Sequence, residues 1–385
     1  MAWLWWQDFN KKMCGNWITN LQLNGQQVKL FISIDQDENG VTVKTDFDFA
    51  LFLNDALYVE YSYDTLNFFH NDRIHRTEYT LALENDNLLK GKYSTNNCWG
   101  IDGHFETDIE FTRLTDEELV KYQYFITPKN AAKIDILKEY AEYGNIKTDT
   151  SFQFLFNERE NMSDIIEKHN LDELVKGKTD AETAIALMNW LCQHYKHGNP
   201  PGGLPGQRTP QALMAAADEW GGRTNCRGLS LILAQLICAY DIKAFHITCS
   251  PYEEPFSDCH VVVCVYCQSL GKHIMLDPSA NLYLRNNAGD IISVEKLRDI
   301  LIADEEVTAN DDRFTNVWQN LAQYRDYMAK NFIRIERYNT NGYGIDGADG
   351  RVVLLPEKYM QNEAKALDYG SKCQFITSRE NFWQE

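Results

Sequence analysis

The sequence predicts a two-part α+β protein, with an antiparallel β-domain over residues 1–115 and a domain of mixed helices and strands over residues 116–385. Two observations predict this division. In the first part, short apolar runs alternate with clusters of Gly, Asn and Asp, which is typical of strands joined by turns. From Thr115 onward, apolar residues recur every three or four positions, which is typical of helices. We therefore expect the boundary at about residues 115–128.

The strands of the first part follow from runs rich in β-branched and aromatic residues. The clearest runs are Gln27–Ile34, Val41–Phe47, Leu57–Tyr63, Tyr79–Leu83 and Ile109–Phe111. About seven or eight short strands at this spacing indicate an antiparallel meander, closed as a barrel or folded as a sandwich.

Two residues at the ends of this meander resemble a pattern known from barrels. Gly15-Asn16-Trp17 precedes the first expected strand, and Arg113 ends the last. They resemble the lipocalin-like pattern, in which an arginine covers a tryptophan at the base of a barrel through a cation–π contact. The resemblance implies a ligand-binding barrel, and a β-domain that packs against the second part and shapes its cleft is the alternative.

Composition limits the classes of partner. The 385 residues include 56 acids and 37 bases, for a net charge of −19, and the two parts are both acidic. No basic face is expected, so nucleic acid and anionic membranes are not expected partners. We also expect no cofactor.

The ten cysteines show no framework spacing, which indicates reduced thiols and a cytoplasmic protein. The apolar start at Met1–Trp6 is too short for a signal sequence. No run approaches the roughly 20 apolar residues of a membrane span.

The most informative stretch of the second part begins at Gly221-Gly222 and contains Cys226. Apolar residues after Cys226 follow the spacing of one buried helical stripe, with Leu229, Leu233 and Leu236 among them. Thr224 or Asn225 can supply the N-cap, and the glycine pair a tight turn. A thiol at this position meets the positive end of the helix dipole, which favours the reactive thiolate.

A histidine and an aspartate follow on two expected strands. His260 lies near the start of a β-branched run, and Asp277-Pro278 ends the next run after a turn at residues 269–272. Pairing these strands antiparallel about the turn brings Asp277 near His260. A thiol nucleophile needs such a base and a third group that orients the base.

In this order, Cys226, His260 and Asp277-Pro278 resemble the transglutaminase-like superfamily of cysteine enzymes. The likeness covers about Ala181 to Leu284 and implies a papain-like α+β core with a Cys–His–Asp triad. Two positions depart from the family pattern. Val262 stands where an aromatic residue is frequent, and Arg227 stands where the crosslinking enzymes have tryptophan.

The expected function is that of a cysteine hydrolase acting on an amide or peptide bond through an acyl-enzyme on Cys226. The expected partner is a peptide, a protein or another amide-containing substrate. Trp220 and Arg227 are the two candidates for a side-chain donor to the oxyanion, beside the backbone N–H of Cys226. The alternatives are a catalytically silent binding or scaffold protein and a protein-crosslinking transglutaminase.

Three further segments complete the interpretation. Cys264 and Cys267 have a zinc-like spacing, but residues three apart on a strand face opposite ways, so we expect no metal site. The Gly- and Pro-rich residues 198–206 are a connector or a flap over the cleft. Residues 339–350 contain Asp346 and are expected to form a turn.

Overall fold

The computed structural model describes residues 9–23, 26–38, 40–47, 54–56, 58–71, 76–96, 104–115, 118, 131–149, 151–156, 159–198, 203–251, 259–311, 313, 321–347, 350–362 and 372–384. These residues fall into two compact units, one within residues 1–132 and one formed by residues 133–252 and 259–385. The predicted α+β class is confirmed. None of the helices in the described ranges has the length and apolar character needed to cross a bilayer.

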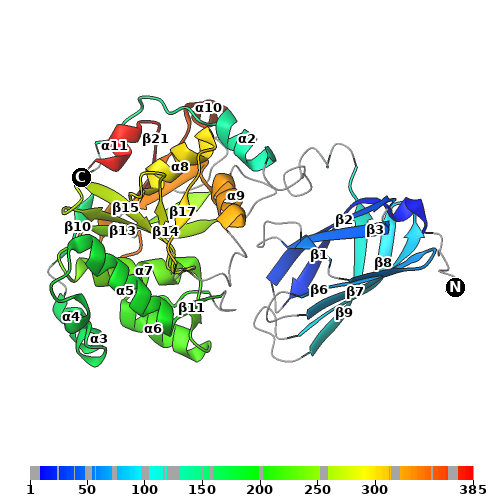
Figure 1. Cartoon of the computed structure of the whole chain (residues 1–385), viewed down its shortest axis with the longest axis horizontal. Coiled ribbons are helices and arrows are strands. Elements are labelled where there is room, and N and C mark those ends of the chain that lie inside the picture. The colour runs from blue at the N-terminus through cyan, green and yellow to red at the C-terminus, as the bar shows by residue number, and fades with distance from the viewer. Residues whose placement is uncertain are drawn as a thin grey trace. The chain divides into compact units, whose positions relative to one another are not determined.

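The N-terminal unit is one antiparallel sheet with strand order β4-β3-β2-β1-β9-β8-β7-β6-β5. Its strands are β1 (Gly15–Leu23), β2 (Gln26–Asp37), β3 (Gly40–Phe47), β4 (Asn54–Asp55), β5 (Tyr58–Tyr61), β6 (Thr65–Asn71), β7 (Arg76–Asn85), β8 (Leu88–Asn96) and β9 (His104–Arg113). Apolar residues at alternate positions of these strands form one core. Strands β3 and β5, which are far apart in the order of the sheet, contact each other, so the sheet curls towards a barrel (Figure 1).

The tryptophan–arginine pair expected at the base of the barrel is present. The guanidinium carbon of Arg113 lies 4.0 Å from the ring centroid of Trp17, which is fully buried. Trp17 donates its indole N–H to the carbonyl of Met13 at 2.9 Å, in the short 3-10 helix η1 (Lys11–Met13). One detail differs from the expectation, because Gly15 and Trp17 lie within the first strand and not before it.

The boundary region is only partly described. Thr115 and Glu118 form the reciprocal backbone hydrogen bonds of a capping box, as their spacing suggests. The capping box and the apolar spacing after it predict a helix over residues 116–124, which lies outside the described residues apart from Glu118.

The C-terminal unit is built on a six-stranded sheet of order β15-β14-β13-β18-β20-β21. Its strands are β13 (Ala244–Ser250), β14 (His260–Cys267), β15 (Lys272–Leu276), β18 (Arg334–Tyr338), β20 (Arg351–Leu354) and β21 (Cys373–Ile376). All neighbours pair antiparallel except β20 and β21, which are parallel. The sequence did not predict β13, which joins the strands of His260 and Arg334.

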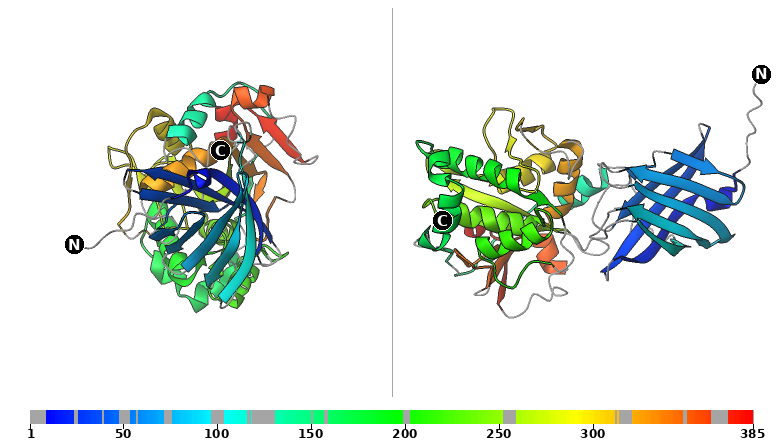
Figure 2. Two further views of the ribbon diagram at one scale, coloured as in Figure 1. Left: turned by 90° about the vertical axis from the view of Figure 1, so that its right-hand side faces the viewer. Right: turned by 90° about the horizontal axis from the view of Figure 1, so that it is seen from below.

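Helices cover both faces of this sheet (Figures 1 and 2). On one face, α5 (Asp180–His194), α6 (Pro210–Glu219) and α7 (Cys226–Cys238) pack with the sheet into the main core. On the other face, α9 (Leu321–Asn331) contacts β13 and α8 (Val294–Ala303). Residues of β14 divide between the faces by alternation, with Val261, Val263 and Val265 on the face of α7 and His260 on the face of α9.

The remaining elements surround this framework. They are α2 (Ala131–Glu139), β10 (Gln153–Phe154), η2 (Arg159–Met162), α3 (Ser163–Lys168), α4 (Leu171–Val175), β11 (Lys196–His197), β12 (Arg223–Thr224), β16 (Leu284–Arg285), β17 (Thr308–Ala309), β19 (Thr340–Asn341), α10 (Glu357–Asn362) and α11 (Arg379–Trp383). The apolar spacing of residues 180–197 predicts a helix over that range, but α5 ends at His194 because Lys196 and His197 pair with β12 instead. Part of the flap-or-connector segment, residues 199–202, lies outside the described residues.

Candidate active site

Cys226 is the first residue of α7, as the sequence predicts. Asn225 is the N-cap, and its side chain accepts the backbone N–H of Gly228 at 2.9 Å. Gly221 and Gly222 both have positive φ, at +66° and +76°, which is the conformation that glycine tolerates best. Cys226 is half-buried, and none of the cysteines in the described ranges is in a disulfide. The chain therefore presents a thiol at the positive end of a buried helix.

His260 and Asp277 meet directly, as the hairpin predicts. The distance from His260 Nε2 to Asp277 Oδ2 is 2.7 Å, and the two side chains are 2% and 0% exposed. Asp277 follows β15, and the register of β14 with β15 pairs Val263 with Leu276, so the two polar residues occupy one face at the same end of the hairpin. An ionised carboxylate can only accept, so Nε2 carries the proton and Nδ1 is the basic nitrogen of the ring.

Two further donors hold the carboxylate of Asp277. The backbone N–H of Ser279 donates to Oδ1 at 2.9 Å, and the hydroxyl of Tyr324 donates to Oδ2 at 3.0 Å. Buried carboxylates are stable only when their oxygens are satisfied in this way. Asp277 is therefore fixed by its own turn and by helix α9.

Helix α9 also supports the imidazole. The ring of Tyr327 contacts that of His260 edge to face, with centroids 5.2 Å apart and an interplanar angle of 74°. The sequence alone did not indicate Tyr324 and Tyr327 as residues of the site. Their spacing of three places both on one helix face, but nothing in a single sequence indicates which strand that face covers.

The start of α7 and the start of β14 lie at the same end of the sheet. Ser230, one turn after Cys226, donates its hydroxyl to the carbonyl of Val261 at 2.9 Å. Cys249 pairs across the strands with His260. Burial, followed by the charges of Cys259, Asp277 and Cys226, raises the pKa of the Cys249 thiol well above its ordinary value. Cys226 and Asp277 thus both lie close enough to Cys249, the cross-strand partner of His260, to affect its pKa.

The two oxyanion candidates differ in their surroundings. Arg227 binds Asp346 through Nη2 at 2.6 Å and through Nε at 3.2 Å, and Nη2 also bonds the hydroxyl of Tyr338. Its guanidinium thus anchors the loop after β19 to the start of α7. Trp220 caps the C-terminus of α6 and is 42% exposed. The guanidinium of Arg227 is therefore already engaged by Asp346 and Tyr338, whereas the side chain of Trp220 is open to solvent.

Asp346 is the centre of a second charged cluster, where the sequence indicated only a turn. Arg208 donates to it from Nε at 2.9 Å, and His246 Nε2 lies 3.5 Å away. Burial alone would raise the pKa of Asp346, but contact with His246 and the hydrogen bonds and charge of Arg227 hold it well below its ordinary value. Asp346 is therefore ionised at neutral pH and ties three segments of the chain together.

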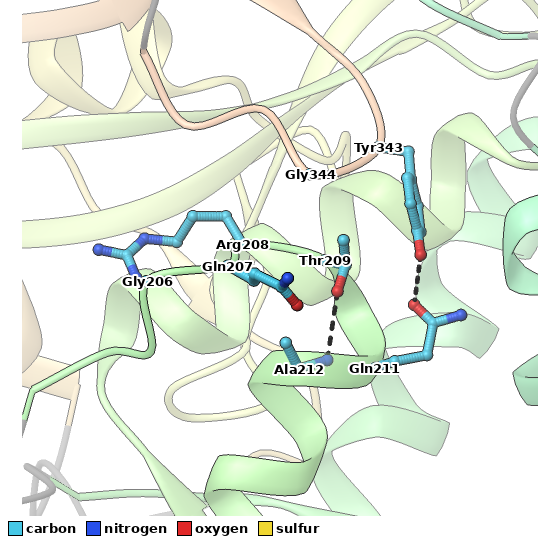
Figure 3. Close-up of a pocket in the computed structure, with 8 residues that line it drawn as sticks. All are labelled: Gly206, Gln207, Arg208, Thr209, Gln211, Ala212, Tyr343 and Gly344. Atoms are coloured by element: carbon cyan, nitrogen blue, oxygen red, sulfur yellow. Dashed lines mark hydrogen bonds between the residues drawn. The ribbon is translucent and has the colours of Figure 1, made fainter.

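A surface pocket of about 890 Å³ lies beside this cluster (Figure 3). Its lining residues are Gly206, Gln207, Arg208, Thr209, Gln211, Ala212, Tyr343 and Gly344. Tyr343 donates its hydroxyl to Gln211 at 3.0 Å across the pocket. None of Cys226, His260 and Asp277 lines it.

The cysteines with zinc-like spacing separate as the strand period predicts. Cys267 belongs to the core beneath α7, whereas Cys264 pairs with Phe245 and lies on the face of His260. In the described part of the chain, no group of three or more His, Cys, Asp or Glu side chains is arranged to hold a metal ion.

Comparisons with known proteins give only remote likenesses. No family model and no curated protein matches the chain. A proposed cysteine protease from Cytophaga hutchinsonii is similar at 10% identity and a TM-score of 0.25, over 66% of this chain and 81% of that one. A proposed protease from Parabacteroides distasonis is similar at 11% identity and a TM-score of 0.24, over 72% of this chain and 57% of that one. At such scores neither likeness bears on fold or function.

Proposed function

We propose that the C-terminal unit is a transglutaminase-like cysteine hydrolase that cleaves an amide or peptide bond through an acyl-enzyme on Cys226. The observation that carries the proposal is the buried hydrogen bond between His260 Nε2 and Asp277 Oδ2. It lies at the end of the sheet where α7 begins with Cys226. A histidine oriented by a carboxylate near a helix-start thiol is the arrangement that thiol nucleophiles require.

The roles follow from the hydrogen bonds. Because Asp277 fixes the proton on Nε2, the other nitrogen of His260 takes the proton of the Cys226 thiol. The sulfur attacks the carbonyl carbon, and the imidazolium then gives its proton to the leaving amine as the C–N bond breaks. A thioester remains. His260 next deprotonates a water molecule, which attacks the thioester, releases the acid and restores the thiol.

The tetrahedral oxyanion would be held by the backbone N–H of Cys226 and by one side chain. Because the guanidinium of Arg227 is already bound to Asp346, Trp220 is the favoured side-chain donor to the oxyanion. Hydrolysis is favoured over crosslinking because the position after the nucleophile is arginine here.

The experiment is incubation of the full chain with a mixed peptide library in water enriched in ¹⁸O, followed by mass spectrometry. Hydrolysis puts one ¹⁸O into each new carboxyl group, whether at a cut peptide bond or at a deamidated side chain. Crosslinking instead joins two peptides without ¹⁸O. We expect ¹⁸O-labelled products from the wild type and none from Cys226→Ala or His260→Ala.

His273→Ala is the matched control, since His273 lies on β15 in the same sheet and its recorded ring contacts are with Phe245, Tyr266 and Trp383. It should keep the wild-type products. Products that persist in Cys226→Ala would refute the acyl-enzyme. A wild type that gives neither ¹⁸O products nor crosslinks from any peptide would favour the silent scaffold.

A further inference from the structure

One oxygen of Asp277 serves two side chains. Oδ2 accepts from His260 Nε2 at 2.7 Å and from the hydroxyl of Tyr324 at 3.0 Å, while Oδ1 accepts from the backbone N–H of Ser279. Both partners of Oδ2 are enclosed, since His260 and Tyr324 are each 1% exposed. The imidazole and the phenol therefore share the charge of a single buried oxygen.

The hydroxyl of Tyr324 must be the donor in its bond. Burial, and then the charge of Asp277 and the hydrogen bond to it, raise the pKa of Tyr324 well above its ordinary value. The phenol therefore keeps its proton, and a carboxylate has none to give. The bond is thus a charge-assisted one that competes with His260 for the same acceptor.

Helix α9 holds this hydroxyl in place. Tyr324 and Tyr327 are one turn apart, and the hydroxyl of Tyr327 reaches the carbonyl of Cys259 at 3.4 Å, directly before His260. The ammonium of Lys330 lies 5.0 Å from the ring centroid of Tyr327, one further turn along. The hydroxyls of Tyr324 and Tyr327 thus join α9 to Asp277 and to the residue before β14, so the position of the Tyr324 hydroxyl is set by the packing of α9.

We propose that Tyr324 is a positioning residue of this site, and that its hydroxyl limits how much of the charge on Asp277 Oδ2 reaches the imidazole of His260. The inference rests on the proposed function, because the imidazole matters chemically only if it serves Cys226. It goes beyond the triad by adding a residue from α9 that the sequence pattern does not indicate.

The physical consequence has a definite sign. Two donors on one oxygen weaken each other, because each withdraws charge from the acceptor. Removing the Tyr324 hydroxyl leaves Oδ2 to His260 alone and stabilises the protonated ring. The effect of one donor on the other is at most that of a single hydrogen bond to the shared oxygen. The titration midpoint of the His260 ring should therefore rise by about 0.5–1 unit in Tyr324→Phe.

Other titratable groups near the ring remain unchanged in that variant. They are Cys226 on α7, Cys249 on β13, Cys259 and Cys264 around and within β14, and Tyr327 and Lys330 on α9. Because these groups are the same in the wild type, they cannot account for a difference between the two proteins.

The experiment is a pH titration of the full chain labelled with ¹³C at histidine Cε1, followed by NMR. The nine histidines are told apart by comparison with His260→Gln. Tyr324→Phe should move the His260 midpoint upward by about 0.5–1 unit. Tyr359→Phe is the matched control, since it removes another fully buried phenol that packs on Tyr140. It should leave the His260 midpoint in place.

A second variant keeps the test valid if Tyr324→Phe fails to fold. Site-specific replacement of Tyr324 by 3-fluorotyrosine keeps the ring and makes the hydroxyl a stronger donor. The His260 midpoint should then move downward. Opposite shifts in the two variants support the sharing of Oδ2. No shift in either variant, or shifts of the same sign in both, would overturn the sharing of Oδ2. A tyrosine with a purely structural role would not move the His260 midpoint upward in one variant and downward in the other.

The readout separates this inference from the proposed function. The NMR midpoint depends on the pair of His260 and Asp277 and does not require Cys226 to react. If the peptide products depend on Cys226 but the midpoint is unmoved, Tyr324 is only structural and the hydrolase stands. If the midpoints shift as expected but no products form, the Tyr324 inference stands and the hydrolase does not.

Discussion

Each unit holds a pair of interacting side chains, partly buried for Arg113 and Trp17 and fully buried for His260 and Asp277, and the two pairs differ in the chemistry that they allow. In the N-terminal unit, Arg113 covers Trp17 and donates to the carbonyls of Lys12, Cys14 and Asp86. In the C-terminal unit, His260 donates from one ring nitrogen to Asp277. Arginine is always protonated and its donors here join segments of the fold, whereas imidazole can still exchange a proton.

The difference shows why burial alone does not identify an active site. Both pairs would destabilise the protein if one partner were removed. Only the second combines a titratable ring, a carboxylate that fixes its tautomer, and a helix-start thiol at the same end of a sheet. The predictions below test whether the first pair acts on stability alone and the second on reactivity.

The largest expected effect is on the reactivity of Cys226 in Asp277→Asn. The amide has no charge to stabilise the imidazolium, and its NH₂ group can favour the wrong tautomer of His260. In a catalytic triad this change costs about 10⁴-fold in turnover, so we expect alkylation of Cys226 at pH 7 to slow by roughly 100-fold or more. The measurement is the rate of iodoacetamide labelling at Cys226, read by mass spectrometry.

Asp290→Asn is the control for that change, since Asp290 is a surface acid whose side chain is 61% exposed. Labelling of Cys226 should keep the wild-type rate there. Equal rates in the wild type and both variants would show that Asp277 only stabilises the fold, and the contrast between the two pairs would disappear.

A smaller effect, on stability only, is expected for Arg113→Met. The change removes a cation–π contact worth about 1 kcal/mol and three hydrogen bonds to carbonyls worth about 1 kcal/mol each. Part of this is recovered by the buried methionine stem, so we expect a loss of about 3 kcal/mol in the N-terminal unit. Hydrogen exchange measured by mass spectrometry reports the two units separately.

In that experiment, exchange should speed up in β1 and β9 and stay unchanged in α7. Labelling of Cys226 should not change. Lys92→Met is the control, because the ion pair of Lys92 with Glu106 is solvent-exposed and should contribute little to the stability of the unit. Slower labelling of Cys226 in Arg113→Met would mean that the contact of Arg113 with Trp17 also affects the reactivity of Cys226.

The smallest expected effect depends on pH and concerns Asp346→Asn. The folded protein lowers the pKa of Asp346, so its carboxylate stabilises the fold above about pH 4, the ordinary aspartate value, and this stabilisation is lost as the pH falls below it. At pH 7 the variant should lose about 1–2 kcal/mol in the C-terminal unit. The difference in the free energy of unfolding between the variant and the wild type, measured by urea unfolding, should become smaller between pH 4 and pH 2.

Asp304→Asn serves as the comparison there, since its side chain is 66% exposed beside Arg325. It should show no such narrowing. A gap in Asp346→Asn that stays constant down to pH 2 would mean that Asp346 acts through its shape and not through its charge.

The sequence predicts the parts of the molecule that are set by local rules. The cap of α7 at Asn225, the positive φ of Gly221 and Gly222, and the pairing of His260 with Asp277 follow from residue type and strand register. In these cases, position along the chain nearly determines position in space. The Trp17–Arg113 contact is different, because it is expected only from the resemblance to the lipocalin-like pattern.

The remaining features depend on long-range packing. Tyr324 lies 47 residues after Asp277, and Asp346 lies 119 residues after Arg227. A single sequence contains no period or motif that predicts these contacts, because they depend on how a helix or loop packs on the sheet. For the same reason, Arg227 could be proposed as an oxyanion donor before its carboxylate partner was known.

The most direct test of the central claim is the pH profile of Cys226 alkylation by iodoacetamide in the wild type, His260→Ala and His273→Ala. If Cys226 is paired with an oriented imidazole, the wild type and His273→Ala should react as thiolates from about pH 5–6, and His260→Ala only near the ordinary cysteine value of about 8.5. Three identical profiles, rising together near pH 8.5, would contradict the account.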